Sequence, residues 1–384
     1  MKILHLIYTS AISGAEKYLK HLLPGMKLYG VETHLVIVCT KETHNLMLDF
    51  AAEFNDKGVP TIVIETTKLK FIFAARKIND YCKNNEICII HSHLSNSDLI
   101  AVIIKRIFNS KILIISTKHG YDENVLQIYE PGITIPPKTL YYRVTKYLQK
   151  NIDKNIAVSK GISDLYFDFG LTDKMSVIHH GVSILHFDKN QFSEQCRKAK
   201  KQLIIVGRIE QFKGHHFLIQ AMVDVVKNFP DCKLLVLGEG NAKASLEAQV
   251  NKLGIKNNVD FLGFQPHPYS YMSNSDVIIL PSLFEPFGLV YIEAFALHVP
   301  VVAFDTMAGN EIIENDVTGL MVPKGNSSLL AEKIIYLLQN EEERKRLSEK
   351  AYETYLEKFT TGTMIKNTAQ WYHDNLDLTQ LNKS

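Results

Sequence analysis

Residues 202–207 read Gln-Leu-Ile-Ile-Val-Gly, an almost continuous apolar run that ends in a glycine. Such a run predicts a strand that is buried on both faces, as the strands of parallel sheets are. An amphipathic stretch over Glu210–Asn228 follows, and a second apolar run occupies Lys233–Gly238. The order strand, helix, strand indicates an α/β unit in which a helix covers a parallel sheet.

The same alternation of apolar and amphipathic stretches continues along the whole chain. In the first half we expect strands at Lys2–Tyr8, Thr33–Cys39, Thr61–Glu65, Ile87–His91, Ile112–Thr117, Asn155–Ser159 and Met175–His179. In the second half we expect them at Gln202–Gly207, Lys233–Gly238, Val259–Phe261, Asp276–Leu280 and Val299–Phe304. A helix is expected over Ala15–Leu28. The fold class is therefore α/β, with doubly wound parallel sheets.

The chain is long enough for two domains, because 384 residues exceed the roughly 100–200 of one compact domain. The polar, lysine-rich stretch 189–201 interrupts the alternation, and we expect it to be a linker. The domains would then be 1–188 and 202–363, with a C-terminal helix, 364–384, that packs back on the first domain. Two such domains facing each other would bring the carboxyl ends of both sheets to one cleft, where ligands bind in open α/β folds.

Composition excludes several classes of protein. The chain is 46% hydrophobic and 22% charged, as ordinary folded proteins are, so disorder and coiled-coil rods are excluded. A net charge of +2 is too small for a nucleic-acid binder. No apolar run reaches the ~20 residues of a membrane-spanning helix, and Met1–Tyr8 suits a strand better than a signal peptide. The five cysteines are scattered, so we expect a cytoplasmic protein.

Residues 281–296 carry the richest pattern, Pro-Ser-Leu-Phe-Glu-Pro-Phe-Gly-Leu-Val-Tyr-Ile-Glu-Ala-Phe-Ala. We expect a strand to end near Leu280 and a helix to begin about Phe287. Backbone amides at the start of a helix attract anions, because they have no partner within the helix and lie at the positive end of its dipole. The amides of Phe287, Gly288 and Leu289 therefore form a candidate phosphate site, and Gly288 allows close approach to the backbone.

Two carboxylates, Glu285 and Glu293, lie at the start of this helix and about two turns along it. Carboxylates beside a phosphate site repel the phosphates, so a sugar hydroxyl and a ribose diol are the partners we expect for them. The other interpretation is structural, with Glu285 as a helix cap and Glu293 in solvent. The segment taken alone leaves both interpretations open.

Two cations follow the strand quoted first. Arg208 and Lys213 lie in a loop with Gly207 and Gly214 on either side. Arginine presents a planar fork and lysine a point charge, a pair suited to a diphosphate whose negative charge grows as a bond breaks. A single cation in a loop is more often a surface residue. The pair gains weight because a candidate phosphate site lies at the same edge of the predicted sheet.

These two segments, in this order, resemble those of the retaining family 4 glycosyltransferases, which have the GT-B fold of two Rossmann-like domains facing a cleft. The signature is Glu285-x7-Glu293 with Phe287-Gly-Leu289 inside it, preceded by Gly207-Arg and Lys213-Gly. Shorter matches are Ser13-Gly-Ala-Glu16, Thr117-Lys-His-Gly120, Ala157-Val-Ser-Lys-Gly161, His180-Gly-Val182, Gly238-Glu-Gly240, Phe261-Leu-Gly-Phe264 and Thr318-Gly-Leu320. The resemblance covers most of the chain.

The resemblance implies the reaction and the residues that serve its leaving group. A sugar would pass from a nucleoside diphosphate donor, UDP or GDP, to an acceptor hydroxyl with retention of configuration. Arg208 and Lys213 would hold the diphosphate, helped by the amides of Phe287, Gly288 and Leu289. We expect no cofactor, since the nucleotide sugar is a substrate.

The resemblance also implies roles for the rest of the donor site. Glu293 would bind the ribose and Glu285 the donor sugar, while the backbone around Phe264 would meet the base. In the first domain, Gly14 would let the chain close over the phosphates and His119 would sit beside the anomeric centre. The implied catalytic set is His119, Arg208, Lys213 and Glu285.

No metal site is expected. The histidine pairs His91/His93 and His179/His180 have no carboxylate or cysteine at ligand spacing, and we interpret them as packing at strand ends. The sequence has no Asp-x-Asp pair of the kind that holds a metal–diphosphate, so the two cations and the helix amides would take the place of the ion. Gly238-Glu-Gly240 lacks the third glycine of a dinucleotide fingerprint.

The stretch Lys138–Lys150 is helical in pattern, basic and interleaved with aromatic residues. One interpretation is a peripheral patch that contacts anionic lipid on the cytoplasmic face of a membrane. The other is a solvated amphipathic helix that covers the sheet.

The expected function is therefore sugar transfer in bacterial cell-surface glycan or glycolipid synthesis. The expected partners are a nucleotide-sugar donor and a glycan or lipid-linked acceptor, without nucleic acid. Three alternatives share the architecture: a nucleotide-sugar epimerase, a phosphorylase that would need pyridoxal phosphate, and a nucleotide-sugar sensor. A sensor needs no charge matched to a leaving group, which argues against it.

Overall fold

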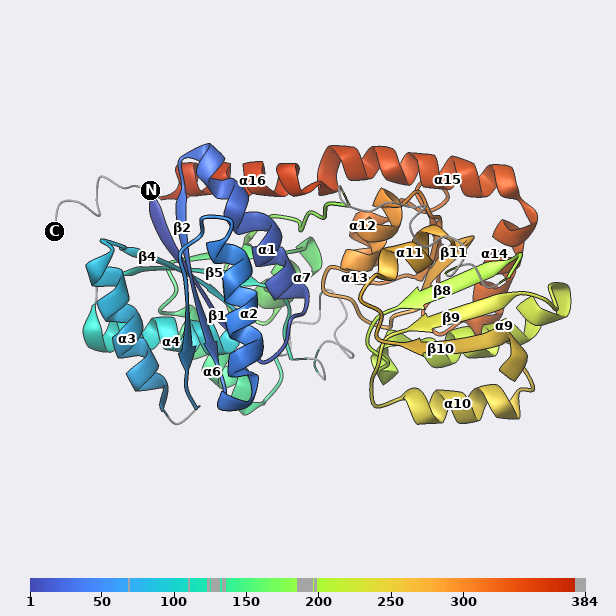
Figure 1. Cartoon of the computed structure of the whole chain (residues 1–384), viewed down its shortest axis with the longest axis horizontal. Helices are drawn as coiled ribbons and strands as arrows, with labels where there is room; N and C mark the ends of the chain where they lie inside the picture. The colour runs from blue at the N-terminus through green and yellow to red at the C-terminus, as the bar shows by residue number, and fades with distance from the viewer. Residues whose placement is uncertain are drawn as a thin grey trace. The chain divides into compact units, whose positions relative to one another are not determined.

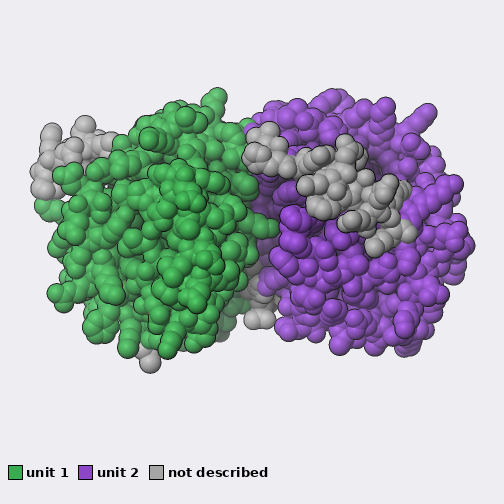
Figure 2. Space-filling model, viewed as in Figure 1, with its two compact units in different colours: residues 1–181, 361–384 green, residues 182–360 purple. Residues whose placement is uncertain are grey.

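The structure, a computed structural model, describes residues 1–67, 70–109, 111–122, 125, 132, 136–184, 196 and 199–376. The chain forms two compact units (Figure 2). Unit 1 is residues 1–181 with 361–384, and unit 2 is residues 182–360. The expected linker, 189–201, lies outside the described residues apart from Cys196 and residues 199–201, so the boundaries at 188 and 202 stay predictions.

Unit 1 is built on a seven-stranded parallel sheet with the strand order β3-β2-β1-β4-β5-β6-β7 (Figure 1). Its strands are β1 (Lys2–Tyr8), β2 (Glu32–Cys39), β3 (Thr61–Glu65), β4 (Ile89–His93), β5 (Leu113–Lys118), β6 (Lys154–Ala157) and β7 (Ser176–Val177). The order reverses between β1 and β4. In open α/β sheets a ligand crevice forms at such a switch point, at the carboxyl ends of the strands.

Helices cover both faces of this sheet, because alternate residues of its strands face opposite cores. In β1, Ile3 and Ile7 pack in the core that includes α1, α2 and α16, whereas Leu4 and Leu6 pack in the core that includes α3 and α4. The helices are α1 (Gly14–Met26), α2 (His44–Asn55), α3 (Phe71–Asn84), α4 (Ser95–Ile103), α6 (Leu140–Gln149), α7 (Lys160–Asp168) and α16 (Thr361–Asn375). Shorter turns are η1 (Lys27–Tyr29), η2 (Lys41–Thr43) and η4 (Ile104–Phe108).

Unit 2 is built on a six-stranded parallel sheet with the order β10-β9-β8-β11-β12-β13 (Figure 1). Its strands are β8 (Gln202–Val206), β9 (Lys233–Leu237), β10 (Val259–Gly263), β11 (Val277–Leu280), β12 (Val301–Phe304) and β13 (Leu320–Val322). The helices are α9 (His215–Asn228), α10 (Lys243–Lys252), α11 (Pro268–Ser273), α12 (Leu289–Ala296), α13 (Met307–Ile312), α14 (Ser327–Gln339) and α15 (Glu341–Thr354). Shorter turns are η5 (Gln211–Lys213), η6 (Lys256–Asn258) and η7 (Tyr355–Phe359).

The α/β fold predicted from the sequence is confirmed, and each expected strand is present with ends that differ by a few residues. The strand expected at Ile87–His91 is β4, which runs from Ile89 to His93. The helix expected over Glu210–Asn228 is divided into η5 and α9. The division occurs because Gly214 has φ +71°, a left-handed conformation that cannot continue a right-handed helix.

The C-terminal helix α16 belongs to unit 1 and packs on α1. The two helices approach closely at Gly25, where a Cβ would stand 2.4 Å from Ile365 Cδ1. Tyr372 of α16 is fully buried, and its hydroxyl shares a hydrogen bond with His91 Nδ1 of β4. The last helix therefore completes the core of unit 1, while residues 377–384 lie outside the described residues.

Replacing Tyr372 tests this packing. Tyr372→Phe leaves His91 Nδ1 without its partner and should lower the free energy of unfolding of unit 1 by about 1–3 kcal/mol. Tyr372→Ala also opens a cavity and should lower it by about 3–5 kcal/mol. Scanning calorimetry measures the change. Tyr336→Ala, at an exposed tyrosine of α14, is the control and should shift stability by about 0.5 kcal/mol or less. An unchanged transition in Tyr372→Ala would contradict the packing.

Candidate active site

In unit 2 the loops that follow β8, β9 and β10 meet at the carboxyl edge of the sheet. The Gly238 amide donates a hydrogen bond to the Gly263 carbonyl over 2.9 Å. A Cβ on Gly238 would stand only 1.9 Å from the Gly207 carbonyl oxygen, so the backbones touch where a side chain has no room. These contacts bring together the loops that carry Arg208 and Phe264.

The two cations predicted to hold a diphosphate lie near one aromatic ring. Arg208 Cζ is 5.5 Å and Lys213 Nζ 5.6 Å from the centroid of the Phe212 ring. Arg208 is exposed and Lys213 is partly buried. At Gly214, a Cβ would stand 1.8 Å from the carbonyl oxygen of Pro281, so this loop lies directly against the segment that follows β11.

Lys213 and Glu285 form an ion pair, with 2.5 Å between Nζ and Oε2. Only 19% and 15% of the two side chains are exposed, so water screens the pair less than it screens a surface pair. Ser282 Oγ lies 3.5 Å from the same carboxylate oxygen. A diphosphate carries more negative charge than one carboxylate, and it would therefore compete with Glu285 for Lys213.

The helix after this pair, α12, begins at Leu289 and not about Phe287 as expected. Its N-cap is Gly288, whose φ of +85° places it outside the helical region. A Cβ on Gly288 would stand 2.4 Å from ring carbons of Tyr291 and 2.9 Å from Glu285 Cγ. The Tyr291 amide donates to the Gly288 carbonyl over 3.0 Å. Glycine has no side chain to accept hydrogen bonds from the amides of Leu289 and Val290, which leaves these to an anion or to water. The Phe287 side chain is buried, so only its backbone can meet a ligand.

The second carboxylate of the signature, Glu293, is buried in α12 with 7% of its surface exposed. The Tyr269 hydroxyl donates a hydrogen bond to Glu293 Oε1 over 3.1 Å. Burial and the Glu293 charge raise the pKa of Tyr269, so it stays a hydrogen-bond donor at neutral pH. The alternative in which Glu293 is solvated is therefore wrong. Phe264, which directly follows β10, is 79% exposed and presents its backbone and ring at the surface.

In unit 1, Gly14 is the first residue of α1, which follows β1 at the carboxyl edge of the sheet. The amide and the hydroxyl of Ser13, the N-cap residue, both donate hydrogen bonds to Glu16 Oε2, over 2.9 and 2.8 Å. This capping arrangement defines where the helix begins. The partly buried Gly14 therefore lies at the positive end of the α1 dipole.

His119 follows β5 in unit 1. Its Nε2 lies 3.1 Å from His93 Nδ1, and the rings of Tyr18 and His180 meet it edge-on at centroid distances of 5.2 and 5.4 Å. Burial, and next the charge of Lys118, lower the pKa of His119 from 6.5 to about 3. The imidazole is therefore neutral at pH 7.

The predicted residues form two groups, one in each unit. Gly14 and His119 belong to unit 1. The structure brings the others together at or beside the carboxyl edge of the unit 2 sheet: Arg208, Lys213, Phe264, Glu285, Phe287, Gly288, Leu289 and Glu293.

Several residues of the site carry no sequence signal. Tyr269 and Phe212 are two of many aromatic residues in the sequence. Their spacing does not predict that Tyr269 contacts Glu293 or that Phe212 lies beside the two cations. The close approach at Gly288 has a signal, since a glycine in the turn before a helix suggests that the backbone meets a neighbour, but the sequence does not identify Tyr291 as that neighbour.

A histidine cluster in unit 1 was also missed as a cluster. His5, His91 and His93 each place one nitrogen within 4.8 Å of the others, because His5 pairs with His91 across β1 and β4 and His93 follows on the same face. Both nitrogens of His91 and both of His93 already have hydrogen-bond partners, among them Tyr372 and Thr117. These hydrogen bonds favour packing over metal binding.

Comparison with known proteins places the chain in a family. Residues 186–354 match the family model "Glycosyl transferases group 1" and residues 12–184 match "Glycosyltransferase Family 4". The chain is 27% identical over 354 residues to the N-acetylgalactosamine-N,N'-diacetylbacillosaminyl-diphospho-undecaprenol 4-alpha-N-acetylgalactosaminyltransferase of Campylobacter jejuni, which covers 90% of this chain and 92% of that one. It is 26% identical over 309 residues to the N-acetyl-alpha-D-glucosaminyl L-malate synthase of Bacillus anthracis, covering 79% and 78% of the two chains.

Solved structures agree on the fold. HepE from Anabaena, in complex with UDP and glucose, superposes with a TM-score of 0.78 at 20% identity, covering 97% of this chain and 100% of that one. Two parallel-sheet α/β units of this kind define the GT-B fold, and the family matches define the activity class as nucleotide-sugar glycosyl transfer. The two matches together span most of the chain, and this protein belongs to glycosyltransferase family 4. The retaining glycosyltransferase predicted from the sequence is confirmed, and the transferase is favoured over the epimerase, the phosphorylase and the sensor.

Gly288→Ala tests the geometry at the start of α12. A methyl group there meets the Tyr291 ring and Glu285, so we expect nucleoside diphosphate binding to weaken about tenfold or more. Titration calorimetry with UDP and with GDP measures the affinity. Gly254→Ala is the matched control, because Gly254 has φ +72° and no described atom within 4 Å of its would-be Cβ. The control should lose stability through backbone strain and keep its affinity. Equal affinities in the two variants would count against the assignment.

Proposed function

We propose that this enzyme transfers a sugar from a UDP-sugar to an acceptor hydroxyl in the synthesis of a bacterial cell-surface glycan or glycolipid. The single observation that carries the residue assignment is the Lys213–Glu285 ion pair beside the left-handed Gly288. It places a cation, a carboxylate and the first-turn amides of α12 side by side at one sheet edge. That combination matches a sugar linked to a diphosphate.

Positive charge stabilises the leaving group, the nucleoside diphosphate. The acceptor oxygen forms a bond to the anomeric carbon as the bond from that carbon to the phosphate oxygen breaks, and the hydroxyl proton passes to the departing phosphate. Negative charge grows on the diphosphate in this step. Arg208, Lys213 and the amides at the start of α12 stabilise it, because they are oriented before the reaction begins.

The two carboxylates of the signature have different surroundings and different proposed partners. Glu285 pairs with Lys213, and it turns to the hydroxyls of the donor sugar once the diphosphate engages that lysine. Glu293 is oriented by the hydrogen bond from the Tyr269 hydroxyl, and it accepts hydrogen bonds from the ribose hydroxyls. A carboxylate that accepts from a diol makes charge-assisted hydrogen bonds, which bind more strongly than neutral ones.

Three similar proteins guide the choice of donor and acceptor. HepE is solved with UDP and glucose, which supports UDP over GDP as the nucleotide here. The Campylobacter relative is named for a sugar linked to diphospho-undecaprenol, whereas the Bacillus relative is an N-acetyl-alpha-D-glucosaminyl L-malate synthase, so the names of the relatives point to different acceptors. The longer match is to the enzyme of the lipid-linked sugar, which supports a lipid-linked acceptor for this chain.

Arg208→Ala and Lys213→Ala test the leaving-group assignment. Each should lower kcat for transfer from a labelled UDP-sugar by about 10²–10³-fold, the usual loss when one preorganised donor to a developing anion is removed. Lys243→Ala, at a lysine of α10 that pairs with the exposed Glu239, is the matched control and should keep kcat. Near-normal turnover in both site variants would refute the assignment. Consumption of the donor without any acceptor product would point to the epimerase.

The helix α6 supports contact with a membrane surface. Its exposed residues include Leu140, Val144 and Tyr147, which are 77%, 40% and 55% exposed and lie on one helical stripe. Its buried residues include the polar Thr145 and Gln149. Leu148 is buried with them, so the helix contributes one apolar side chain to the core and leaves three in solvent, which is unusual for a solvated helix.

Basic side chains accompany this stripe. Lys138, Arg143, Lys146 and Lys150 are all exposed. Each basic residue near an anionic membrane contributes about 1 kcal/mol of attraction. None of the helices in the described ranges is both long and apolar enough to span a bilayer. We therefore propose peripheral contact of α6 with anionic lipid.

Leu140→Asp tests this contact. It replaces an apolar side chain by an anionic one, so the fraction of protein that sediments with phosphatidylcholine–phosphatidylglycerol vesicles should fall about tenfold or more. Leu28→Asp, at a leucine of η1 that is 86% exposed, is the control and should sediment like the wild type. A wild type that fails to bind these vesicles, or equal losses in both variants, would contradict the proposal.

A further inference from the structure

A row of buried imidazoles runs behind His119 in unit 1. His5 comes from β1, His93 from the end of β4, and His119 from the residue after β5. His5 Nδ1 lies 3.0 Å from His93 Nε2, and His93 Nδ1 lies 3.1 Å from His119 Nε2. The three rings therefore form one hydrogen-bonded chain that crosses three neighbouring strands of the sheet.

The chain couples the proton positions of its members. A neutral imidazole has one N–H donor and one acceptor nitrogen, and both nitrogens of His93 are engaged. If His5 donates to His93, then His93 must donate to His119, and the proton of His119 resides on Nδ1. If His119 donates instead, every bond reverses and His119 Nδ1 becomes an acceptor. The tautomer of His119 is thus not independent of His93 and His5.

The surroundings keep the chain neutral. Burial lowers the pKa of His5 to about 3 and that of His93 well below 6.5, as it lowers the pKa of His119. Burial also raises the pKa of Tyr18, so its hydroxyl stays protonated. The titratable groups that face His119 are Tyr18 of α1, His93 of β4, the adjacent Lys118, and His180, which follows β7.

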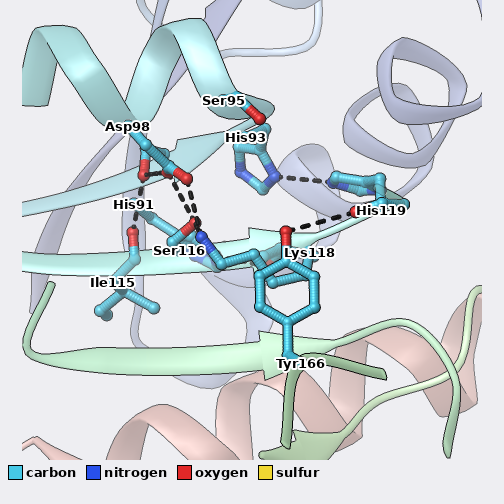
Figure 3. Close-up of polar contacts among 12 residues, drawn as sticks. His91, His93, Ser95, Asp98, Ile115, Ser116, Lys118, His119 and Tyr166 are labelled. Atoms are coloured by element: carbon cyan, nitrogen blue, oxygen red, sulfur yellow. Dashed lines mark hydrogen bonds and ion pairs between the residues drawn. The ribbon is translucent and has the colours of Figure 1, made fainter. Parts of the chain in front are cut away.

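The backbone on both sides of His119 is anchored independently of this chain (Figure 3). Lys118 is buried and donates to Asp98 Oδ2 and to Ser116 Oγ, each over 2.7 Å. The Tyr166 hydroxyl donates to the carbonyl of Gly120 over 3.4 Å. With the backbone held at positions 118 and 120, the orientation of the His119 ring depends on the Tyr18 and His180 rings packed against it and on what its own nitrogens contact.

One of those nitrogens is left for a ligand. His119 Nδ1 is buried and has no hydrogen-bond partner in the part of the chain that the structure describes, whereas Nε2 meets His93. A buried imidazole nitrogen without a hydrogen bond lowers the stability of the protein unless a bound molecule supplies that hydrogen bond. A sugar hydroxyl can both donate and accept a hydrogen bond, so it can bond to His119 Nδ1 in either tautomer.

We propose that His93 is a positioning residue for His119: it holds the ring and selects its tautomer, so that Nδ1 meets a hydroxyl of the bound sugar. This inference rests on the proposed role of His119 beside the anomeric centre. His5 acts through His93 as the far end of the chain. His91 lies on the same strand as His93 but bonds to Tyr372 and Thr117, and it takes no part.

Three substitutions separate positioning from packing. His93→Leu keeps the site apolar and removes both hydrogen bonds. His93→Asn places an amide near the former Nδ1, so it keeps a partner for His119 and loses the bond to His5. His34→Leu is the matched control, because His34 is an equally buried histidine of β2 whose partners are Tyr81 and Glu32.

The kinetic readout is the split between kcat and KM. His93→Leu should lower kcat about 10- to 100-fold, the loss expected when a reacting group is slightly misplaced, with KM for the UDP-sugar changed less than about twofold. His93→Asn should recover part of that loss, and His34→Leu should keep kcat. Wild-type kcat in His93→Leu, or equal losses in His93→Leu and His34→Leu, would overturn the proposal.

A second readout does not depend on activity. Long-range ¹H–¹⁵N correlation spectra of ¹⁵N-histidine-labelled protein report the tautomer and charge of each ring, and His119→Gln assigns the His119 signals. The wild type should show His119 neutral and in one tautomer between about pH 5 and 8, since its pKa lies far below that range. His93→Leu should show a mixture of tautomers.

The kinetic and spectroscopic readouts distinguish a failure of the proposed function from a failure of the inference about His93. If the wild type transfers no sugar from any donor, the proposed function fails, and the spectra still decide whether His93 selects the tautomer. If transfer depends on Arg208 and Lys213 but the His119 signals are the same in wild type and His93→Leu, only the inference about His93 fails. A wild-type His119 that is charged at pH 6 or divided between tautomers overturns it without any variant.

Discussion

The ion pair between Lys213 and Glu285 is the contact on which the proposed donor site depends. It joins the loop after β8 to the loop after β11, and both loops are fixed to each other at the backbone through Gly214 and Pro281. Because the pair is largely shielded from water, neither charge is satisfied by solvent alone. A ligand that brings both a diphosphate and hydroxyl groups can replace the pair without leaving either charge unpaired.

The two units contribute opposite electrostatics. Unit 2 presents cations and carboxylates at one sheet edge, whereas burial lowers the pKa of His93 and His119 in unit 1 and keeps these imidazoles neutral. Lys118, one of the buried charged residues of unit 1, is neutralised by Asp98. Asp98 in turn accepts from Ser92 and Ser116, so the pair is fully hydrogen-bonded and holds the end of β5.

Much of the fold and part of the site followed from local patterns. Runs such as residues 202–206 are apolar enough to demand burial on both faces, and that requirement alone predicts parallel strands. The cations and carboxylates of unit 2 were found because residues that follow parallel strands gather at one sheet edge. The start of α12 was misplaced by two residues, since the left-handed conformation of Gly288 depends on the Tyr291 ring against it. The three-residue strand β13 is too short to leave a pattern.

The sequence by itself determined which segments become strands and helices, and which charged residues lie beside a strand end. Only the tertiary structure decided that Glu293 is buried and accepts a hydrogen bond from Tyr269, and that Lys213 forms its ion pair with Glu285. It also decided that the rings of His5, His93 and His119 are joined by hydrogen bonds. Hydrophobic periodicity and secondary-structure propensity depend on a few neighbouring residues, so they can be recognised from the sequence alone. A hydrogen bond between residues 88 positions apart, as between His5 and His93, depends on the register of β1 against β4 and on the packing around them.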